Sequence, residues 1–165
     1  MKFWVDRLVA ALPSRAALAA HPWLKPFAGR LLDPQLWQLQ HEAVARGVAV
    51  GVFWAFAMPV AQMVVAVVHC IWWRANIPLA ISMTLVTNPL TIGPWLWLAY
   101  QLGVLLLGET LADSGWQGFA ALTWLAEFGL PIMLGMGIFA VGGAAAGYLG
   151  IKLALYLQRT LWKTD

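Results

Sequence analysis

The side chains that could carry chemistry in this sequence are a few polar residues set inside long apolar runs. They gather around two proline breaks in the middle of the chain. A polar group inside hydrocarbon costs free energy, so such residues are rare unless they pair with one another or line a functional path. The candidates within or between these runs are Gln62, His69, Arg74, Asn76, Thr84, Thr87, Asn88, Thr91, Gln101 and Glu127.

The two breaks predict a binding site. Proline removes a backbone donor and clashes with the preceding helical turn, so each break frees carbonyl oxygens that lipid cannot satisfy. The amino-terminal ends of half-helices suit an anionic group, and unwound carbonyls suit a cation. We therefore expect one substrate-binding site where the broken elements meet, formed by Pro59, Gln62, Arg74, Asn76, Asn88 and Thr91. The competing interpretation is that the amide side chains only satisfy backbone groups that proline has released.

Two titratable residues are weaker candidates for proton coupling. His69 changes charge near neutral pH, and Glu127 stands where the last apolar run begins. Each also has an ordinary interpretation, as an anchor at the membrane boundary and as a carboxylate facing water. The sequence contains no Ser-His-Asp arrangement, no glycine-rich nucleotide loop and no cluster with metal-ligand spacing. We expect no enzyme activity, no cofactor and no metal site.

The elements that must position these residues are apolar helices. Of 165 residues, 62% are hydrophobic and 10% are charged, whereas a soluble domain has about 25% charged residues. Runs without Asp, Glu, Lys or Arg cover residues 47–73, 75–108 and 128–151. Each run is longer than the ~20 residues with which a helix crosses a bilayer. The sequence therefore predicts an all-α, polytopic membrane protein with proline-broken or re-entrant helices.

Positive charge lies at the two ends of the chain. Residues 1–46 carry six Lys or Arg, residues 152–165 carry three, and the apolar middle carries Arg74 alone. Under the positive-inside rule, both ends face the cytoplasm. Basic flanks of this kind contact anionic headgroups, so membrane lipids are the expected partners and nucleic acid is not.

The chain is expected to have three segments: cytoplasmic or interfacial amphipathic helices over 1–46, a transmembrane domain over 47–151 and a basic cytoplasmic tail over 152–165. In the first segment, residues 2–12 place apolar side chains on one face and charged ones on the other. A second helix is expected to begin at Asp33-Pro34 and to run through Arg46 into the membrane, because Asp caps exposed amides and proline fits the first helical position.

The breaks favour one topology and leave a second open. Because both basic ends should share one side of the membrane, the number of crossings should be even. The favoured arrangement has a re-entrant hairpin at 47–73, a crossing within 78–108 broken at Asn88-Pro89 and Gly93-Pro94, and a return crossing at 128–151. The alternative has four full spans, with the second apolar run folded as a hairpin around Asn88-Pro89.

Small residues four positions apart predict close helix packing. Gly47 with Gly51 opens the first apolar run, and Gly143 with Gly147 lies in the last one. Such spacing lets two helix backbones approach closely in lipid. The packing partner is either another helix of the same chain or a second copy, so a homo-oligomer is also open.

A set of motifs in the apolar region resembles a known bacterial family. They are Arg46-Gly47 through Gly51, Pro59 with Gln62, Arg74-x-Asn76-x-Pro78, Thr87-Asn88-Pro89-Leu90-Thr91 with Pro94, and Tyr100-x-x-Gly103. In this order they are similar to a family of small bacterial membrane proteins known as domain of unknown function 2062. One departure is Ala61, where the family is associated with glycine. The resemblance implies a bacterial inner-membrane protein and brings no activity with it.

A looser likeness concerns architecture alone. Paired segments broken at proline look like the re-entrant loops of DedA-type membrane proteins, a group linked to lipid movement and proton-coupled transport. Since fold does not fix function, two classes remain as hypotheses. The first is a small transporter, channel or lipid-moving protein with its site at the broken helices. The alternative is a non-catalytic subunit or assembly factor of a cell-envelope complex.

The charge pattern makes a prediction about topology. We expect reporter fusions at either end of the chain to report the cytoplasm, because basic residues flank the apolar middle on both sides. An external C-terminus would require an odd number of crossings and would contradict both topologies.

Overall fold

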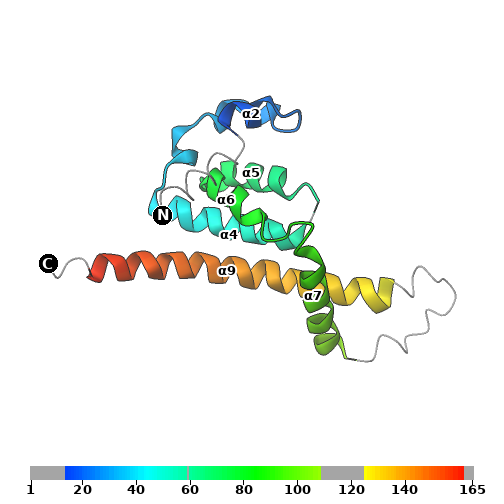
Figure 1. The fold of residues 1–165 in the computed structure, drawn as a ribbon. Helices are drawn as coiled ribbons and strands as arrows, with labels where there is room; N and C mark the ends of the chain where they lie inside the picture. Colours follow the sequence, from blue (N-terminus) through cyan, green and yellow to red (C-terminus); the bar gives the residue numbers. More distant parts are fainter. Residues whose placement is uncertain (1–13, 59, 109–124, 162–165) are drawn as a thin grey trace.

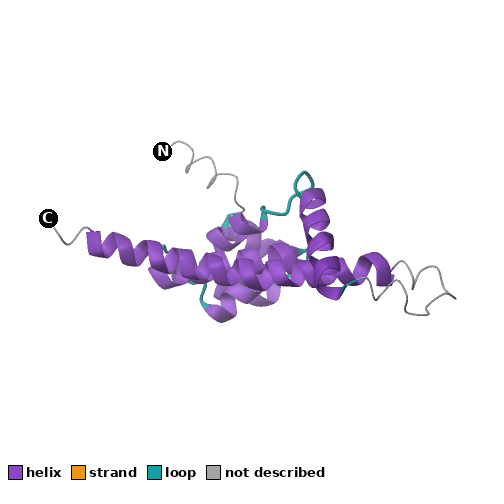
Figure 2. Cartoon of the chain, turned by 90° about the horizontal axis from the view of Figure 1, so that it is seen from below, coloured by secondary structure: helices purple, strands orange, loops and turns teal. Residues whose placement is uncertain are grey.

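The computed structural model describes residues 14–58, 60–108 and 125–161, and all regular structure in these ranges is helical (Figures 1 and 2). The all-α prediction is confirmed for this part of the chain. The elements are α2 (Arg15–Ala20), η1 (Lys25–Phe27), α3 (Ala28–Leu31), η2 (Pro34–Trp37), α4 (His41–Ala57), α5 (Gln62–Trp73), α6 (Ile77–Thr84), α7 (Ile92–Leu107), the π-helical turn η4 (Leu125–Gly129) and α9 (Leu130–Leu161).

The segment before α4 consists of short helical turns rather than one long helix. Asp33 does cap a helical turn, since its carboxylate accepts from the backbone N–H of Gln35 at 2.9 Å. That turn ends at Trp37, however, and α4 begins anew at His41, so the predicted continuous helix through Arg46 is wrong. The predicted amphipathic helix over 2–12 lies outside the described residues.

Helices α4, α5 and α6 form a compact up-and-down unit. Helical structure is interrupted between α4, which ends at Ala57, and α5, which begins at Gln62, inside the first apolar run as expected. In this connection Ala61 adopts a left-handed conformation with φ of 58°. At the opposite end, the Arg46 guanidinium donates to the Trp73 carbonyl at 3.0 Å, so the end of α5 returns to the start of α4. This helical hairpin has the shape expected of 47–73, and its placement within a membrane stays a prediction.

Small residues let α6 lie directly on α4. A Cβ on Gly47 would stand 2.7 Å from the carbonyl oxygen of Asn76, and a Cβ on Gly51 would meet the backbone of Ala80. The backbone N–H of Asn76 also donates to the Ala43 carbonyl at 2.9 Å. The predicted close packing of the Gly47 and Gly51 face is therefore confirmed, with α6 as its partner.

The second apolar run breaks once, not twice. Helix α6 ends at Thr84 and α7 begins at Ile92, with Asn88-Pro89 in the gap as predicted. Gly93-Pro94 does not form a second break, because it lies in the first turn of α7. Proline is tolerated there since the first amides of a helix have no intrahelical acceptor.

The long helix α9 holds the structure together by packing on both α4 and α7 (Figure 1). A Cβ on Gly143 would stand 2.9 Å from Cγ1 of Val52, and one on Gly147 would stand 2.8 Å from Cγ1 of Val48. The predicted helix contact of this face is confirmed within the chain. An oligomer formed elsewhere on the surface stays a prediction.

Where α7 crosses α9, the two backbones nearly touch. A Cβ on Gly103 would collide with the backbone of Pro131, and a Cβ on Gly135 would collide with the backbone of Ala99. At this crossing, Gly103 of α7 lies against the backbone of α9, and Gly135 of α9 lies against the backbone of α7. Figure 1 shows α7 lying across α9 rather than alongside it.

One helix in the described residues is long and apolar enough to cross a membrane, the segment Glu127–Gln158. Only 22% of its most apolar window is buried within the protein, unlike the core helix of a soluble domain. A membrane location is therefore suggested. The 32 residues of α9 extend about 48 Å, which is more than the ~30 Å of a hydrocarbon core. Multiple crossings stay a prediction.

Two neighbouring glycines of α9 allow a matched test of the α7 crossing. We expect Gly135→Ala to lower the free energy of unfolding by about 1–3 kcal/mol, because its methyl group would force α7 and α9 apart. Gly137 has no atom within 4 Å of a built Cβ. Gly137→Ala should be neutral or stabilising by up to about 1 kcal/mol through helix propensity. Thermal unfolding in mild detergent measures both, and equal stability of the two variants would contradict the crossing.

Candidate functional site

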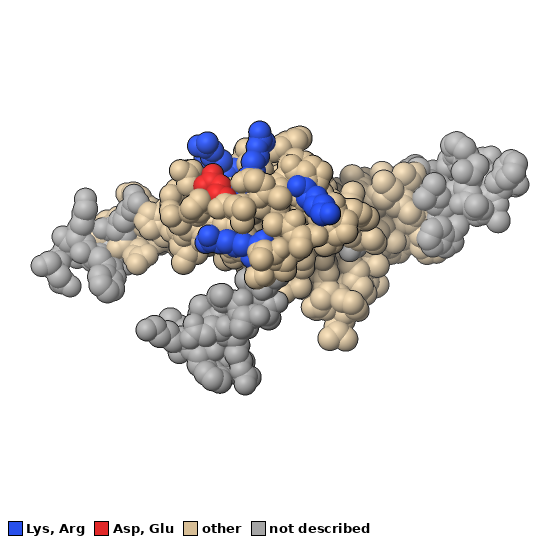
Figure 3. All heavy atoms as spheres, turned by 90° about the horizontal axis from the view of Figure 1, so that it is seen from above, with Lys and Arg blue, Asp and Glu red and all other residues tan. Residues whose placement is uncertain are grey.

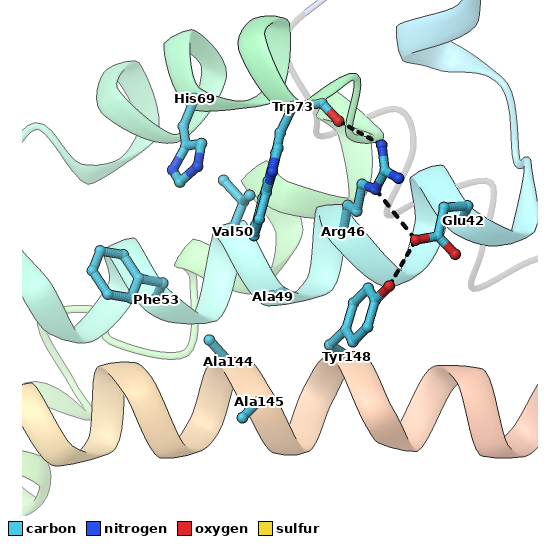
Figure 4. Close-up of a pocket in the computed structure, with 10 residues that line it drawn as sticks. All are labelled: Glu42, Arg46, Ala49, Val50, Phe53, His69, Trp73, Ala144, Ala145 and Tyr148. Carbon is cyan, nitrogen blue, oxygen red and sulfur yellow. Dashed lines mark hydrogen bonds and ion pairs between the residues drawn. The ribbon is translucent and has the colours of Figure 1, made fainter.

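A cavity of about 630 Å³ lies between α4, α5 and α9 (Figure 4). Its walls are mostly apolar, and its charged residues, Glu42 and Arg46, both come from the first turns of α4. The lining residues are Glu42, Arg46, Ala49, Val50, Phe53, His69, Trp73, Ala144, Ala145 and Tyr148. The cavity is therefore amphipathic, with charged side chains at one end and mostly apolar side chains along the rest of its length.

The charged end is organised around the Glu42 carboxylate. Oε1 accepts from the Tyr148 hydroxyl at 2.6 Å and lies 3.3 Å from Nε of Arg46. Oε2 lies 3.2 Å from Nζ of Lys152, whose ammonium group also stands 5.0 Å from the centre of the Tyr148 ring. One carboxylate thus joins the start of α4 to α9 and holds two cations at the rim of the cavity.

Glu42 is ionised over a wider pH range than an ordinary glutamate. The Tyr148 hydroxyl, followed by the Lys152 ammonium group, donates to the carboxylate and lowers the pKa of Glu42. With Arg46 and Lys152 positive and Glu42 negative, the rim carries a net positive charge at neutral pH. This charge suits an anionic group at the mouth of an apolar cavity.

His69 forms part of the cavity wall. Its Nδ1 accepts from the indole N–H of Trp54 at 2.9 Å, and its ring faces that of Trp73 with centroids 5.1 Å apart. The accepting Nδ1 leaves Nε2 as the protonated nitrogen of the neutral ring. Glu127, the other candidate for proton coupling, is exposed in the π-helical turn and is absent from the cavity lining. Proton coupling stays a prediction.

Gln62 closes the break between α6 and α7. Its Nε2 donates to the Thr84 carbonyl at 3.0 Å. The Thr87 hydroxyl lies 2.7 Å from the Ala55 carbonyl oxygen and 3.0 Å from Oε1 of Gln62, so its proton can serve either acceptor. The end of α4, the start of α5 and the break are thereby tied together by side chains that satisfy carbonyls freed from helices.

Asn88 and Thr91 stabilise the same break locally. Oδ1 of Asn88 accepts from the backbone N–H groups of Leu90 and Thr91 at 2.8 and 3.1 Å. The Thr91 hydroxyl lies 2.7 Å from the Val86 carbonyl and accepts from the Asn88 N–H at 3.0 Å. These are the bonds of an Asx turn, which shape the chain before α7.

Asn76 and Arg74 lie at the other end of the unit. Asn76 is fully buried and caps α6, with Oδ1 accepting from the Leu79 N–H at 2.9 Å and Nδ2 donating to the Gln38 carbonyl at 2.9 Å. Arg74 ends α5 in a left-handed conformation with φ of 50° and has an exposed side chain. Both residues therefore belong to the end where α4 begins.

The structure does not bring the six predicted site residues into one cluster. Gln62 begins the 12-residue α5 and Arg74 follows it, so their backbones are separated by about 18 Å. Asn76 and Asn88 likewise stand beyond opposite ends of α6. Pro59 lies outside the described residues. The polar residues at the breaks divide into two groups, and their hydrogen bonds are those that the structural interpretation expects.

Sequence reasoning does not identify most of the residues that organise the cavity. It treats Arg46 and Lys152 only as basic flanking residues and assigns no role to Glu42. The i, i+4 spacing of Glu42 and Arg46 was the one available signal. Tyr148 and Lys152 lie more than 100 positions away, and nothing in the local pattern pairs them with Glu42. In the described ranges, His, Cys, Asp and Glu form no group of three that suits a metal ion.

Comparison with known proteins gives a family without an assigned activity. A family described as an uncharacterized protein conserved in bacteria, domain of unknown function 2062, matches residues 24–163. No curated protein and no solved structure matches the chain.

The buried position of Asn76 predicts a structural role. We expect Asn76→Ala to lower the free energy of unfolding by about 1–3 kcal/mol, because it leaves the Leu79 N–H and the Gln38 carbonyl without their partner. The control is Gln38→Ala, which keeps the backbone carbonyl that Asn76 binds and should have little effect. Thermal unfolding in detergent distinguishes them. A stable Asn76→Ala protein would point away from the structural interpretation of this residue.

Proposed function

The chain belongs to the bacterial family known as domain of unknown function 2062, and from its cavity we propose that it is an inner-membrane protein that binds and moves a membrane lipid. The observation that carries the proposal is the amphipathic cavity beside α9 (Figure 4). An apolar cavity with a few convergent polar groups is the usual form of a small-molecule site. A lipid has the matching chemistry, with a phosphate for the Arg46 end and acyl chains for the apolar walls.

The position of the charges supports a membrane setting for this cavity. Glu42, Arg46 and Lys152 stand at one end of the α4 and α9 pair, and the opposite half of α9 is apolar. If α9 crosses the membrane, the start of α4 and the end of α9 face the same side, as the positive-inside rule requires. The α4–α5 hairpin then enters the bilayer from that side and returns to it, as a re-entrant element does.

Lipid movement is favoured over an ion or solute path through the breaks. The side chains of Gln62, Thr87 and Asn88 form hydrogen bonds with backbone groups at the helix ends, so these polar groups are already paired. The cavity instead runs along α9, whose exposed apolar side chains are suited to contact with acyl chains. A lipid in this cavity would keep its headgroup at the rim and its chains beside the bilayer.

A second candidate function is that of a non-catalytic subunit of an envelope complex. It is favoured by the outer face of α9, where Gly142 and Gly150 have no atom within 4 Å of a built Cβ. Small residues that are open on a membrane helix allow close approach of another helix. On this hypothesis, the apolar cavity would receive a side chain of a partner rather than a lipid.

Two alanines of α9 test lipid binding. Ala144 lines the cavity and points toward α4 in Figure 4, whereas Ala146 is exposed and is not among the lining residues. We expect Ala144→Trp to reduce the phospholipid retained by the purified protein several-fold, because the indole fills the apolar chamber, and Ala146→Trp to retain the wild-type amount. Native mass spectrometry of protein released from mild detergent counts the bound lipids.

The same preparation separates the two candidate functions. Equal lipid retention by wild type, Ala144→Trp and Ala146→Trp, with unchanged thermal stability, would refute a lipid site in this cavity. A stoichiometric protein partner lost only from Ala146→Trp would favour the subunit hypothesis instead.

A further inference from the structure

A second cavity, of about 430 Å³, lies beside the carboxyl end of α5 and differs in character from the first. Trp73 lines the apolar cavity, and its neighbour Trp72 lines this one. Successive residues of a helix point about 100° apart, so the two cavities open on different faces of α5. The second is lined by Arg30, Asp33, Leu36, Ile71, Trp72 and Arg74.

Two arginines from distant parts of the chain meet at this cavity. Arg30 comes from α3, and Arg74 follows α5. Within the described residues, neither guanidinium group has an ion-pair or hydrogen-bond partner, in contrast to Arg46, which binds both Glu42 and the Trp73 carbonyl. Two unpaired guanidinium groups beside one hollow form an attractive site for an anion.

The backbone at Arg74 adds a second observation. A helix that ends in the left-handed conformation usually has glycine there, since a Cβ is disfavoured at positive φ. This chain has arginine at φ of 50°, with the Ala75 N–H donating to the Cys70 carbonyl at 3.0 Å across the turn. Strained backbone at non-glycine residues tends to occur at functional sites. The turn directs the chain so that Arg74 lines the cavity.

The single carboxylate of the cavity is already engaged in the fold. Asp33 accepts from the Gln35 N–H through Oδ1 at 2.9 Å, and it forms no ion pair with either arginine in the described structure. The cavity therefore has two positive groups and one negative group. The face of the molecule seen in Figure 3 likewise shows more basic than acidic side chains.

We propose that Arg30 and Arg74 bind a phosphate group in this cavity. The planar guanidinium group matches the spacing of phosphate oxygens, so two arginines can each donate two hydrogen bonds to one phosphate. Trp72, which is 71% exposed, offers an apolar surface next to the site. This second site is independent of lipid binding beside α9.

The same phosphate chemistry has two sources, a lipid headgroup and a soluble phosphate. Trp72 favours the headgroup, because exposed tryptophans settle at the interface between hydrocarbon and water. The two sources are distinguished by probes that share the phosphate and differ in the acyl chains: inorganic phosphate and dihexanoyl phosphatidic acid. Dihexanoyl glycerol carries the chains without the phosphate and serves as the ligand control.

The test uses the full-length protein in a mild non-ionic detergent. Titration of each probe is followed by thermal unfolding, since a ligand that binds the folded state raises its melting temperature. The variant is Arg30→Gln with Arg74→Gln, and its charge-matched control is Arg15→Gln with Lys25→Gln, which removes two exposed cations that do not line the cavity. Ala144→Trp reports separately on the apolar cavity.

We expect phosphatidic acid to stabilise the wild type and the control pair, and the Arg30 and Arg74 pair to bind it roughly tenfold more weakly or worse. Stabilisation by inorganic phosphate as well would identify a soluble phosphate as sufficient, and stabilisation by the lipid alone would identify a headgroup. Ala144→Trp should leave this affinity unchanged even if it abolishes lipid retention. The proposal is overturned if dihexanoyl glycerol stabilises as well as phosphatidic acid, if neither phosphate probe stabilises, or if both double variants respond alike.

Discussion

The close approach of helix backbones at glycine is the constraint on which the rest of the structure depends. Gly143 and Gly147 bring α9 against α4, and Gly103 and Gly135 fix the crossing of α7 and α9. Where apolar helices lie in lipid, no hydrophobic force draws one to another, so their association depends on backbone proximity and the dispersion contacts that it permits. The distance between α4 and α9 set in this way determines the width of the cavity and places Tyr148 within reach of Glu42.

The sequence correctly indicated that the chain is helical and where two of its helix breaks lie. Apolar runs, the prolines and the small-residue spacing report local constraints, and these are correct for 57–62 and for Asn88-Pro89. The predicted second break at Gly93-Pro94 was wrong, because a proline that would interrupt the interior of a helix is tolerated in its first turn. The helix expected to run on from Asp33 failed for a related reason, since a good cap fixes where a helix begins and not where it ends.

The candidate site was harder to predict because it depends on tertiary contacts. Polar residues near a break attract attention, yet Gln62, Thr87 and Asn76 are engaged with backbone groups. The cavity takes its character from small and apolar residues such as Ala49 and Ala145, which no motif distinguishes from helix surface. Arg30 and Arg74 meet only because α3 folds back to the end of α5. Composition shows that such residues exist, and the three-dimensional path shows which of them are neighbours.

The bond from Tyr148 to Glu42 spans 106 positions of the chain, which bears on the order in which the protein is assembled. Helices α4, α5 and α6 follow one another closely and contact one another, so they can associate while the ribosome is still synthesising α7. Helix α9 follows the other described helices along the chain, and it brings one wall of the cavity together with the hydroxyl and ammonium groups that bind Glu42. Until then, the apolar face of α4 lacks its cover. A nascent chain is therefore most exposed to misassembly in the interval before α9 is synthesised.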